Sequence, residues 1–385
     1  MSEREKIIPY SRQLIEQDDI DAVVEVLKSD YLTQGSKVVE FEKALAEYCS
    51  AKYAIVFSSG TAALHAAYSS IDLKKGDEII TTPITFAATV NAAVCYGAKP
   101  VFVDVEPDLP NIDATLIESK ITDKTRAIVP VHYSGHPVNI GKIHEIARAY
   151  KIPVIEDACH AIGAKYKDIR IGPLSDMTIF SFHPVKPMTT GEGGAVLTNH
   201  EVLYEKMKMV REHGITKDKR FLIHKEEGDW YYEMHEMGFN CRLTDIQSAL
   251  GISQLKKLDR YIEERREIVK FYHEHLKDVS EIEMPKERNY AYSSWHLFPI
   301  MLMGELARKR REIFEELRAR KIWVQVHYIP VYWHPYYQMM GFSKGLCRTA
   351  ENFYKSTISL PVYPGMTSDD AQYVVDTLKN IISKY

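Results

Sequence analysis

The sequence predicts an α/β fold in which helices cover both faces of a largely parallel sheet. Two observations support this fold class. Short runs rich in β-branched residues alternate with helix-length segments from about residue 50 to residue 200. Side chains suited to chemistry stand where several of these runs end, and sites in parallel sheets lie at the carboxyl ends of the strands.

The expected elements follow from this alternation. We expect strands at residues 53–57, 78–82, 100–105, 127–131, 153–156, 177–182 and 195–198. We expect helices at residues 62–70, 87–96 and 140–149.

The pattern changes beyond Arg242. Apolar residues at helical spacing, mixed with many charges, predict one or two long helices over residues 244–276. A strand at 295–303, an amphipathic helix near 305–320 and a strand at 322–328 follow, and the last helix opens with a capping box at Thr367. We therefore expect a large domain over residues 1–250 and a smaller C-terminal α/β domain over residues 251–385.

Composition excludes several classes of protein. The chain has 385 residues, of which 45% are hydrophobic and 26% charged, with a net charge of −4. This balance offers no basic face for nucleic acid. No apolar stretch is long enough to cross a membrane, and no signal-like segment follows Met1, so the predicted location is the cytoplasm. The cysteines are 5 in number and widely spaced, and HExxH is absent, so we expect free thiols and no metal.

The most informative segment carries Lys186. This lysine lies in a loop stiffened by Pro184 and Pro187, directly after the expected strand at 177–182. Asp157 ends another apolar run. A lysine and an acid at the exits of two buried strands suit pyridoxal phosphate chemistry, in which the lysine binds the cofactor as an imine and the acid keeps the pyridine nitrogen protonated. The alternatives are a surface lysine and a loop-capping acid.

Two further signals indicate a bound cofactor. The small residues from Ser58 to Thr61 open an expected helix and let N–H groups and hydroxyls approach an anion there, although an ordinary helix cap has the same composition. Ser181 is placed to add a hydroxyl to the same phosphate. Phe86 follows a strand and suits stacking on a planar ring, with a buried core phenylalanine as the alternative.

Six ordered motifs run along essentially the whole chain. They are SSGTAAL (58–64), residues 83–89, VFVDV (101–105), EDACHAIGA (156–164), SFHPVK with TTGEGG (181–194) and GFNCRLTDIQSALG (238–251). In this order they resemble the DegT/StrS-type sugar aminotransferases. The resemblance implies a fold-type I, pyridoxal phosphate-dependent aminotransferase whose large domain holds a mostly parallel, seven-stranded sheet.

The resemblance also implies roles for single residues. Lys186 matches the Schiff-base lysine and Asp157 its pyridinium partner. Asn240 matches an asparagine that reaches the phosphate from the neighbouring subunit, which implies a homodimer with shared active sites. The other implied cofactor contacts are His160 near the cofactor, Phe86 on its ring, and Gly60, Thr61 and Ser181 at its phosphate.

Residues 181–194, 230–234 and 325–330 resemble the branch of the family that acts in pseudaminic acid biosynthesis. This implies transfer of an amino group from L-glutamate to C4 of a UDP-linked 4-keto-6-deoxy-N-acetylhexosamine, with release of 2-oxoglutarate. The implied substrate contacts are Tyr10, Asp30, Tyr31, Leu32, Thr33, Gln325, Val326, His327 and Tyr328.

Alternatives remain open at this stage. Another nucleotide-linked keto sugar, aminated at C3 or C4, would fit the same motifs, because Cys241 stands where many members carry tyrosine and Asp30–Tyr31 is a variable pair. A dehydratase branch of the family has histidine where Lys186 stands, so the lysine argues against that branch. A non-enzymatic protein that binds pyridoxal phosphate is the remaining alternative.

Overall fold

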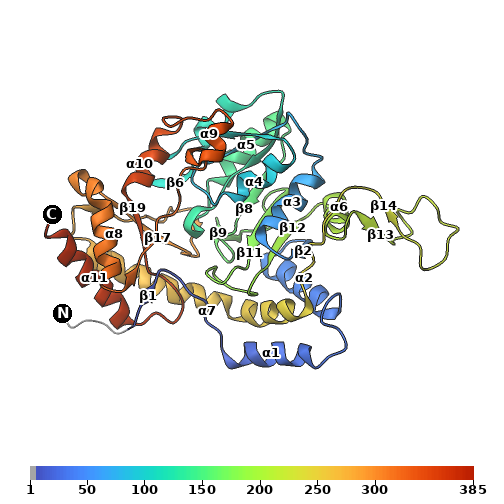
Figure 1. Cartoon of the computed structure of the whole chain (residues 1–385), viewed down its shortest axis with the longest axis horizontal. Helices are drawn as coiled ribbons and strands as arrows, with labels where there is room; N and C mark the ends of the chain where they lie inside the picture. The colour runs from blue at the N-terminus through green and yellow to red at the C-terminus, as the bar shows by residue number, and fades with distance from the viewer. Residues whose placement is uncertain (1–5) are drawn as a thin grey trace.

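The computed structural model describes residues 6–385 (Figure 1). One sheet has four strands in the order β2 (Tyr53–Phe57), β12 (Gly194–Thr198), β11 (Met177–Ser181) and β8 (Ile155–Asp157). β8 and β11 are parallel, whereas β12 is antiparallel to both of its neighbours.

A second sheet is wholly parallel. It contains β4 (Lys99–Phe102), β3 (Glu78–Thr81) and β7 (Thr125–Val129) in that order. Two isolated parallel bridges, Ile128 with Val154 and Val131 with Asp157, connect its β7 edge to the β8 edge of the first sheet. The predicted α/β class is confirmed, and the predicted strands differ from the observed ones mainly at their ends.

Both faces of these sheets are buried. Ile55 and Ile179 belong to a core packed by α3 (Gly60–Ser70), α4 (Ala88–Cys95) and α6 (Glu201–Arg211). Their chain neighbours Val56 and Phe180 belong to another core, packed by α2 (Ser36–Cys49) and α5 (Ile140–Tyr150). Successive side chains of a strand point to opposite faces, so strands buried on both sides appear in the sequence as continuous apolar runs.

The longest helix, α7 (Asp245–Leu276), links two cores. Thr244 caps it in a capping box with Gln247. Leu255, Leu258 and Ile262 pack in the core of the sheets, while residues from 268 to 276 pack in a C-terminal core. The predicted one or two helices are therefore a single helix, and α1 (Gln17–Leu27) runs beside it (Figure 1). The predicted domain boundary at residue 250 stays a prediction.

The C-terminal part has an antiparallel sheet of its own. Its strands are β15 (Ile282–Glu283), β17 (Phe298–Leu302) and β19 (Thr357–Leu360), in that order. Its helices are α8 (Arg310–Ala319), α9 (Pro335–Met339), α10 (Arg348–Ser356) and α11 (Ser368–Ile382). The predicted capping box of the last helix is present at Thr367.

The expected strand at 322–328 is wrong for most of its length. Only β18 (Ile322–Trp323) is a strand, and it pairs in parallel with β1 (Ile8–Pro9). Farther on, the His327 carbonyl accepts a hydrogen bond from the Tyr133 hydroxyl, so a side chain takes the place of a sheet partner. Other short pairings join β5 (Val105–Glu106) to β6 (Leu109–Ile112), and β9 (Lys165–Tyr166) to β10 (Ile169–Arg170) and β16 (Ala291–Tyr292).

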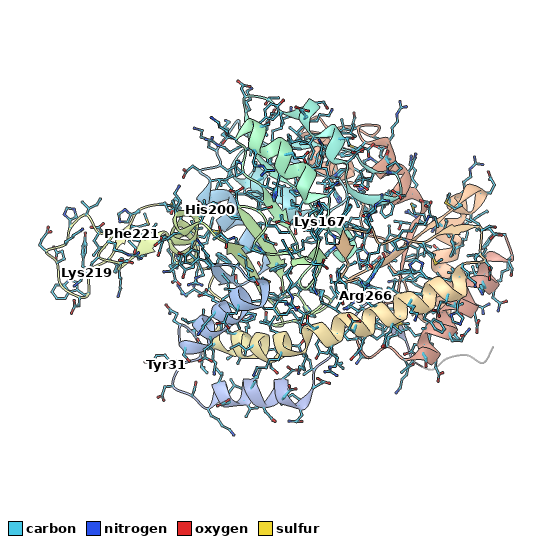
Figure 2. All side chains as sticks on the ribbon, turned by 180° about the vertical axis from the view of Figure 1, so that it is seen from behind. Tyr31, Lys167, His200, Lys219, Phe221 and Arg266 are labelled. Atoms are coloured by element: carbon cyan, nitrogen blue, oxygen red, sulfur yellow. The ribbon has the colours of Figure 1, made fainter. Side chains whose placement is uncertain are left out.

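Residues 213–239 form a projecting arm between α6 and α7. It contains the antiparallel pair β13 (Ile215–Thr216) and β14 (Glu233–Met234) and extends away from the body of the chain (Figure 1). Figure 2 shows Lys219 and Phe221 in the outer part of this arm, seen from behind. Among the helices of residues 6–385, none has the length and apolar character needed to cross a membrane.

Candidate active site

A cavity of about 630 Å³ lies at the carboxyl ends of β8 and β11. It brings together side chains from the two sheets, from the N-terminal segment and from the region after β18. The predicted site residues that line it are Tyr10, Gly60, Thr61, Phe86, Asp157, His160, Ser181, Lys186, His327 and Tyr328.

Asp157 is a buried acid at the end of β8, with 4% of its surface exposed. The Thr89 hydroxyl donates to its Oδ2 at 2.5 Å, and the Cys159 N–H donates to its Oδ1 at 3.1 Å. A Thr85 hydroxyl lies 2.7 Å from the Thr89 hydroxyl and can donate to it. These donors fix the orientation of the carboxylate.

Lys186 follows β11 in a tight turn. Its N–H donates to the His183 carbonyl at 2.9 Å, and the Ser11 hydroxyl donates to the Val185 carbonyl at 2.9 Å, so the loop is held from two sides. Burial lowers the pKa of the Lys186 amine, while the nearby Cys159 and Asp157 oppose that shift. A lysine with a lowered pKa is a better nucleophile and base at neutral pH.

The start of α3 makes a cradle for an anion. Ser59 caps the helix, and its hydroxyl accepts from the Ala62 N–H at 3.1 Å. A Cβ added to Gly60 would lie 3.0 Å from Ser181 Cβ and 3.3 Å from its hydroxyl oxygen. A side chain at position 60 would therefore crowd Ser181, and glycine lets the positive end of this helix approach Ser181 without that crowding.

Five rings surround the rest of the cavity. The His160 ring is buried, and its Nε2 lies 3.1 Å from the Tyr328 hydroxyl. Tyr10 and His327 have ring centroids 5.1 Å apart. Phe86 lies 6.2 Å from the Tyr328 ring and is 62% exposed, so the interpretation of Phe86 as a buried core residue is wrong.

The other predicted site residues do not line this cavity. Asp30, Tyr31, Leu32 and Thr33 are exposed in the loop after α1, where the Leu32 carbonyl accepts from the Asp245 N–H at 3.0 Å. The remaining ones are Gln325, which pairs with Ser359, its neighbour Val326, and Asn240, which is exposed beside α6.

Several cavity residues were not singled out from the sequence. Thr89, Cys159, His183 and Glu192 all line it. Thr85 and Thr89 are four residues apart, a spacing that brings side chains together on a helix turn, so the sequence could have indicated a pair of neighbouring hydroxyls there. Cys159 and His183 stand within two and three residues of predicted site residues but carried no pattern of their own.

The residues present fit pyridoxal phosphate. The cradle at Gly60 and Ser181 suits a phosphate, the desolvated Lys186 amine suits a carbonyl group, and the fixed Asp157 carboxylate suits a protonated ring nitrogen. Exposed Phe86 offers a flat face within the same cavity. This set of groups is the chemistry that the sequence predicted for the two strand ends.

Comparison with known proteins finds relatives that are named as transaminases or aminotransferases. The chain is 44% identical over 381 residues to the UDP-4-amino-4,6-dideoxy-N-acetyl-beta-L-altrosamine transaminase of Campylobacter jejuni subsp. jejuni, with 98% of each chain covered. Helicobacter pylori PseC, an aminotransferase involved in the biosynthesis of pseudoaminic acid, is similar in structure. Its TM-score is 0.93 at 36% identity, covering 99% of this chain and 100% of that chain.

The PLP-form of a putative sugar aminotransferase, Spr1654 from Streptococcus pneumoniae, is also similar. Its TM-score is 0.91 at 28% identity, covering 98% of this chain and 99% of that chain. Together with the cavity, these similarities confirm a fold-type I aminotransferase whose cofactor is pyridoxal phosphate. Since the model of the DegT/DnrJ/EryC1/StrS aminotransferase family matches residues 13–379, the chain belongs to that family.

Proposed function

We propose that the chain transfers an amino group from L-glutamate to C4 of a UDP-linked 4-keto-6-deoxy-N-acetylhexosamine and releases 2-oxoglutarate. The observation that carries the proposal is the desolvated Lys186 amine beside Asp157 in one cavity. The substrate is proposed from the likeness to the Campylobacter jejuni transaminase, which extends over 381 residues at 44% identity.

The chain's own residues supply the binding and the proton transfers. Lys186 would bind pyridoxal phosphate covalently, Asp157 would pair with its ring nitrogen, and Phe86 and His160 would flank its ring. Gly60, Thr61 and Ser181 would hold its phosphate at the start of α3. When bound, the cofactor supplies an electron sink for the negative charge left by proton loss from the amino donor.

Lys186 Nζ is the proposed acid and base. With its pKa lowered by burial, the neutral amine can take the proton from Cα of bound glutamate. In the second half-reaction the same nitrogen delivers a proton to C4 of the sugar. The hydrogen bonds from Thr89 and Cys159 hold the Asp157 carboxylate in one orientation, so it would stay beside the ring nitrogen through both halves.

We also propose a homodimer with shared active sites. The arm carries several strongly exposed apolar side chains, which isolated monomers seldom leave in one patch. They are Ile223, Trp230, Tyr232, Met234, Met237 and Phe239. Asn240 is exposed next to the arm and would contact the phosphate bound by the partner.

The finer architectural and binding predictions stand as proposals. The two sheets would act as one seven-stranded sheet, supported by the bridges between β7 and β8, with domains over residues 1–250 and 251–385. Tyr10, His327 and Tyr328 would contact the sugar from within the cavity. The proposed sugar-nucleotide contacts outside it are Asp30, Tyr31, Leu32, Thr33, Gln325 and Val326. The cytoplasm stays the predicted location.

The test uses the cofactor's visible absorbance. Glutamate alone should shift the band of the purified holoenzyme, and addition of the UDP-linked keto sugar should restore it. Borohydride reduction followed by mass spectrometry should label Lys186. No shift with glutamate would contradict the proposal, and restoration only by a dTDP- or GDP-linked sugar would move the chain to another substrate of the same family.

A further inference from the structure

His160 and Tyr328 form a hydrogen-bonded chain with the backbone of Ser134. The Ser134 N–H lies 3.2 Å from His160 Nδ1, and His160 Nε2 lies 3.1 Å from the Tyr328 hydroxyl. We propose that His160 is a positioning residue that makes Tyr328 a fixed hydrogen-bond donor to an uncharged oxygen of the bound keto sugar. This inference rests on the proposed function and specifies that, in the proposed contact between Tyr328 and the sugar, Tyr328 is the hydrogen-bond donor.

The direction follows from the chemistry of the donor. A backbone N–H can only donate, so His160 Nδ1 must hold a lone pair. Neutral His160 therefore carries its hydrogen on Nε2 and donates it to the Tyr328 oxygen. That oxygen uses a lone pair in this bond, so the hydroxyl hydrogen of Tyr328 is left for a second partner. Since Tyr328 lines the cavity, that partner is the bound ligand.

The surroundings keep His160 neutral. Burial lowers the pKa of His160 well below its ordinary range, and the nearby Lys186 and His327 side chains act in the same direction. The His296 ring lies 4.5 Å away, centroid to centroid, and burial keeps its pKa low as well. A second proton on His160 would also set an N–H against the Ser134 N–H, which costs an unsatisfied donor.

The loop that contains Ser134 and Gly135 orients the Ser134 N–H toward the His160 ring. Ser134 has a φ of 56°, in the left-handed region that residues with a Cβ seldom occupy. Gly135 has a φ of 91°, and a Cβ there would lie 2.4 Å from the Ser294 hydroxyl. That hydroxyl donates to the His160 carbonyl at 2.9 Å, so both the ring and the backbone of His160 are held. Strained backbone of this kind is retained where a precise orientation matters.

Tyr328 is held from the other side. The Tyr133 hydroxyl donates to the His327 carbonyl at 2.5 Å, and His327 Nδ1 lies 2.9 Å from the Ser359 hydroxyl. The residue before Tyr328 is thereby anchored to both the large sheet region and β19. The hydroxyl of Tyr328 is fixed in space as well as in direction.

The wall around Tyr328 indicates an uncharged acceptor. Its ring neighbours are His327 at 4.9 Å, His160 at 5.9 Å, Phe86 at 6.2 Å and Tyr133 at 6.4 Å, centroid to centroid. Carboxylates and phosphates are bound best by charged donors such as arginine. Within residues 6–385 no arginine lines this cavity, and its one lysine, Lys186, is the proposed point of cofactor attachment. A neutral hydroxyl donor among aromatic rings suits a keto or hydroxyl oxygen of a sugar better than the carboxylates of glutamate.

The experiment measures the two half-reactions of the holoenzyme separately by cofactor absorbance. Tyr328→Phe should lower kcat/KM for the UDP-linked keto sugar about tenfold, the loss of one neutral hydrogen bond, and leave the glutamate half-reaction within about twofold. The matched control is Tyr336→Phe on α9, whose ring is exposed outside the cavity, and it should change neither half-reaction.

Two substitutions of His160 separate positioning from packing. In His160→Gln the amide oxygen can accept from Ser134 and the amide nitrogen can donate to Tyr328, so the sugar half-reaction should stay within about threefold of wild type. His160→Leu loses both bonds and should match Tyr328→Phe in the sugar half-reaction. The gap between the Gln and Leu variants should vanish when Tyr328 is already phenylalanine, since the chain then has no hydroxyl to orient.

Each result decides between hypotheses. If wild type shows no absorbance change with glutamate, the proposed function itself fails. If wild type completes both half-reactions but Tyr328→Phe keeps its sugar kcat/KM, the inference about Tyr328 fails alone. If the gap between His160→Gln and His160→Leu persists without the Tyr328 hydroxyl, His160 acts by another route and its positioning role is wrong.

Discussion

The cavity around Lys186 and the projecting arm at 213–239 differ in how their side chains are satisfied. In the cavity, Asp157 is 4% exposed and its two oxygens accept hydrogen bonds from the same chain. On the arm, Trp230 is 76% exposed and Met237 is 77% exposed. The buried acid is held by donors of its own chain, whereas the apolar groups of the arm are exposed in the single chain and would be covered only by another molecule.

This difference in burial suits the cavity to catalysis and the arm to association. In the cavity, burial lowers the pKa of Lys186 by disfavouring its charged form, and hydrogen-bond donors of the same chain orient Asp157. The arm has order of its own, since Glu233 accepts from the Ile223 and His224 N–H groups at 2.8 Å. It is therefore a shaped surface, and we expect its role to be association.

The largest effect should come from Lys186→Ala. Removing the amine removes the proposed covalent attachment and the proton carrier together, so turnover should fall by at least about a thousandfold. Steady-state rates with glutamate and the UDP-linked sugar measure this loss. The matched control is Lys142→Ala, a change of an exposed side chain on α5, which should keep full activity. Substantial turnover by Lys186→Ala would show that Lys186 is not the catalytic lysine and that this cavity is not the active site.

Asp157→Asn should follow, with a loss of about a hundredfold or more. The amide keeps the shape of the side chain but not its charge, so it cannot hold a proton on the cofactor nitrogen. Cofactor content, measured by absorbance, should fall far less than the rate. Asp123→Asn in an exposed loop is the control. A near wild-type rate for Asp157→Asn would show that the buried acid is only a structural cap.

Much of the cavity could be predicted because its key residues follow local rules. Strands are recognisable from β-branched runs, and parallel strands present their ends at one edge, so Lys186 and Asp157 were expected to meet there. The contacts that orient them were not predictable. Thr89 lies 68 positions from Asp157 and His160 lies 168 positions from Tyr328, so these hydrogen bonds depend on how the whole chain packs.

The regions farther from the sheets were harder to predict for the same reason. Residues 322–328 have a strand-like composition, yet only Ile322–Trp323 forms a strand, because the N-terminal segment covers just those two residues and Gln325 makes a single isolated bridge to Ser359. The apolar residues of the arm do not recur along its whole length with the spacing of a helix or a strand. Their exposure is apparent only in the folded structure, so the sequence alone does not identify the arm as an exposed apolar surface.

Subunit complementation tests whether the two regions cooperate across a dimer. We expect an Asn240→Leu variant to be severely impaired, because the proposed phosphate contact from the partner is lost. Mixed in equal amounts with Lys186→Ala and allowed to exchange subunits, it should recover about a quarter of wild-type activity, since half of the dimers are mixed and each has one intact site. No recovery, with exchange verified by mass spectrometry, would mean that each chain completes its own site.

The smallest expected effect concerns the surface of the arm itself. Trp230 packs over Gly228 and leaves most of its ring exposed, so its burial against a partner would contribute on the order of 2 kcal/mol. Trp230→Ser should therefore raise the dimer dissociation constant by about tenfold or more, measured by sedimentation across a dilution series. Lys219→Ser, an exposed change on the same arm, is the matched control (Figure 2). Activity of Trp230→Ser should fall on dilution and return at higher protein concentration, because its catalytic groups are intact. If its dissociation constant equals that of wild type, the arm does not form the interface, and the exposed side chains need another partner.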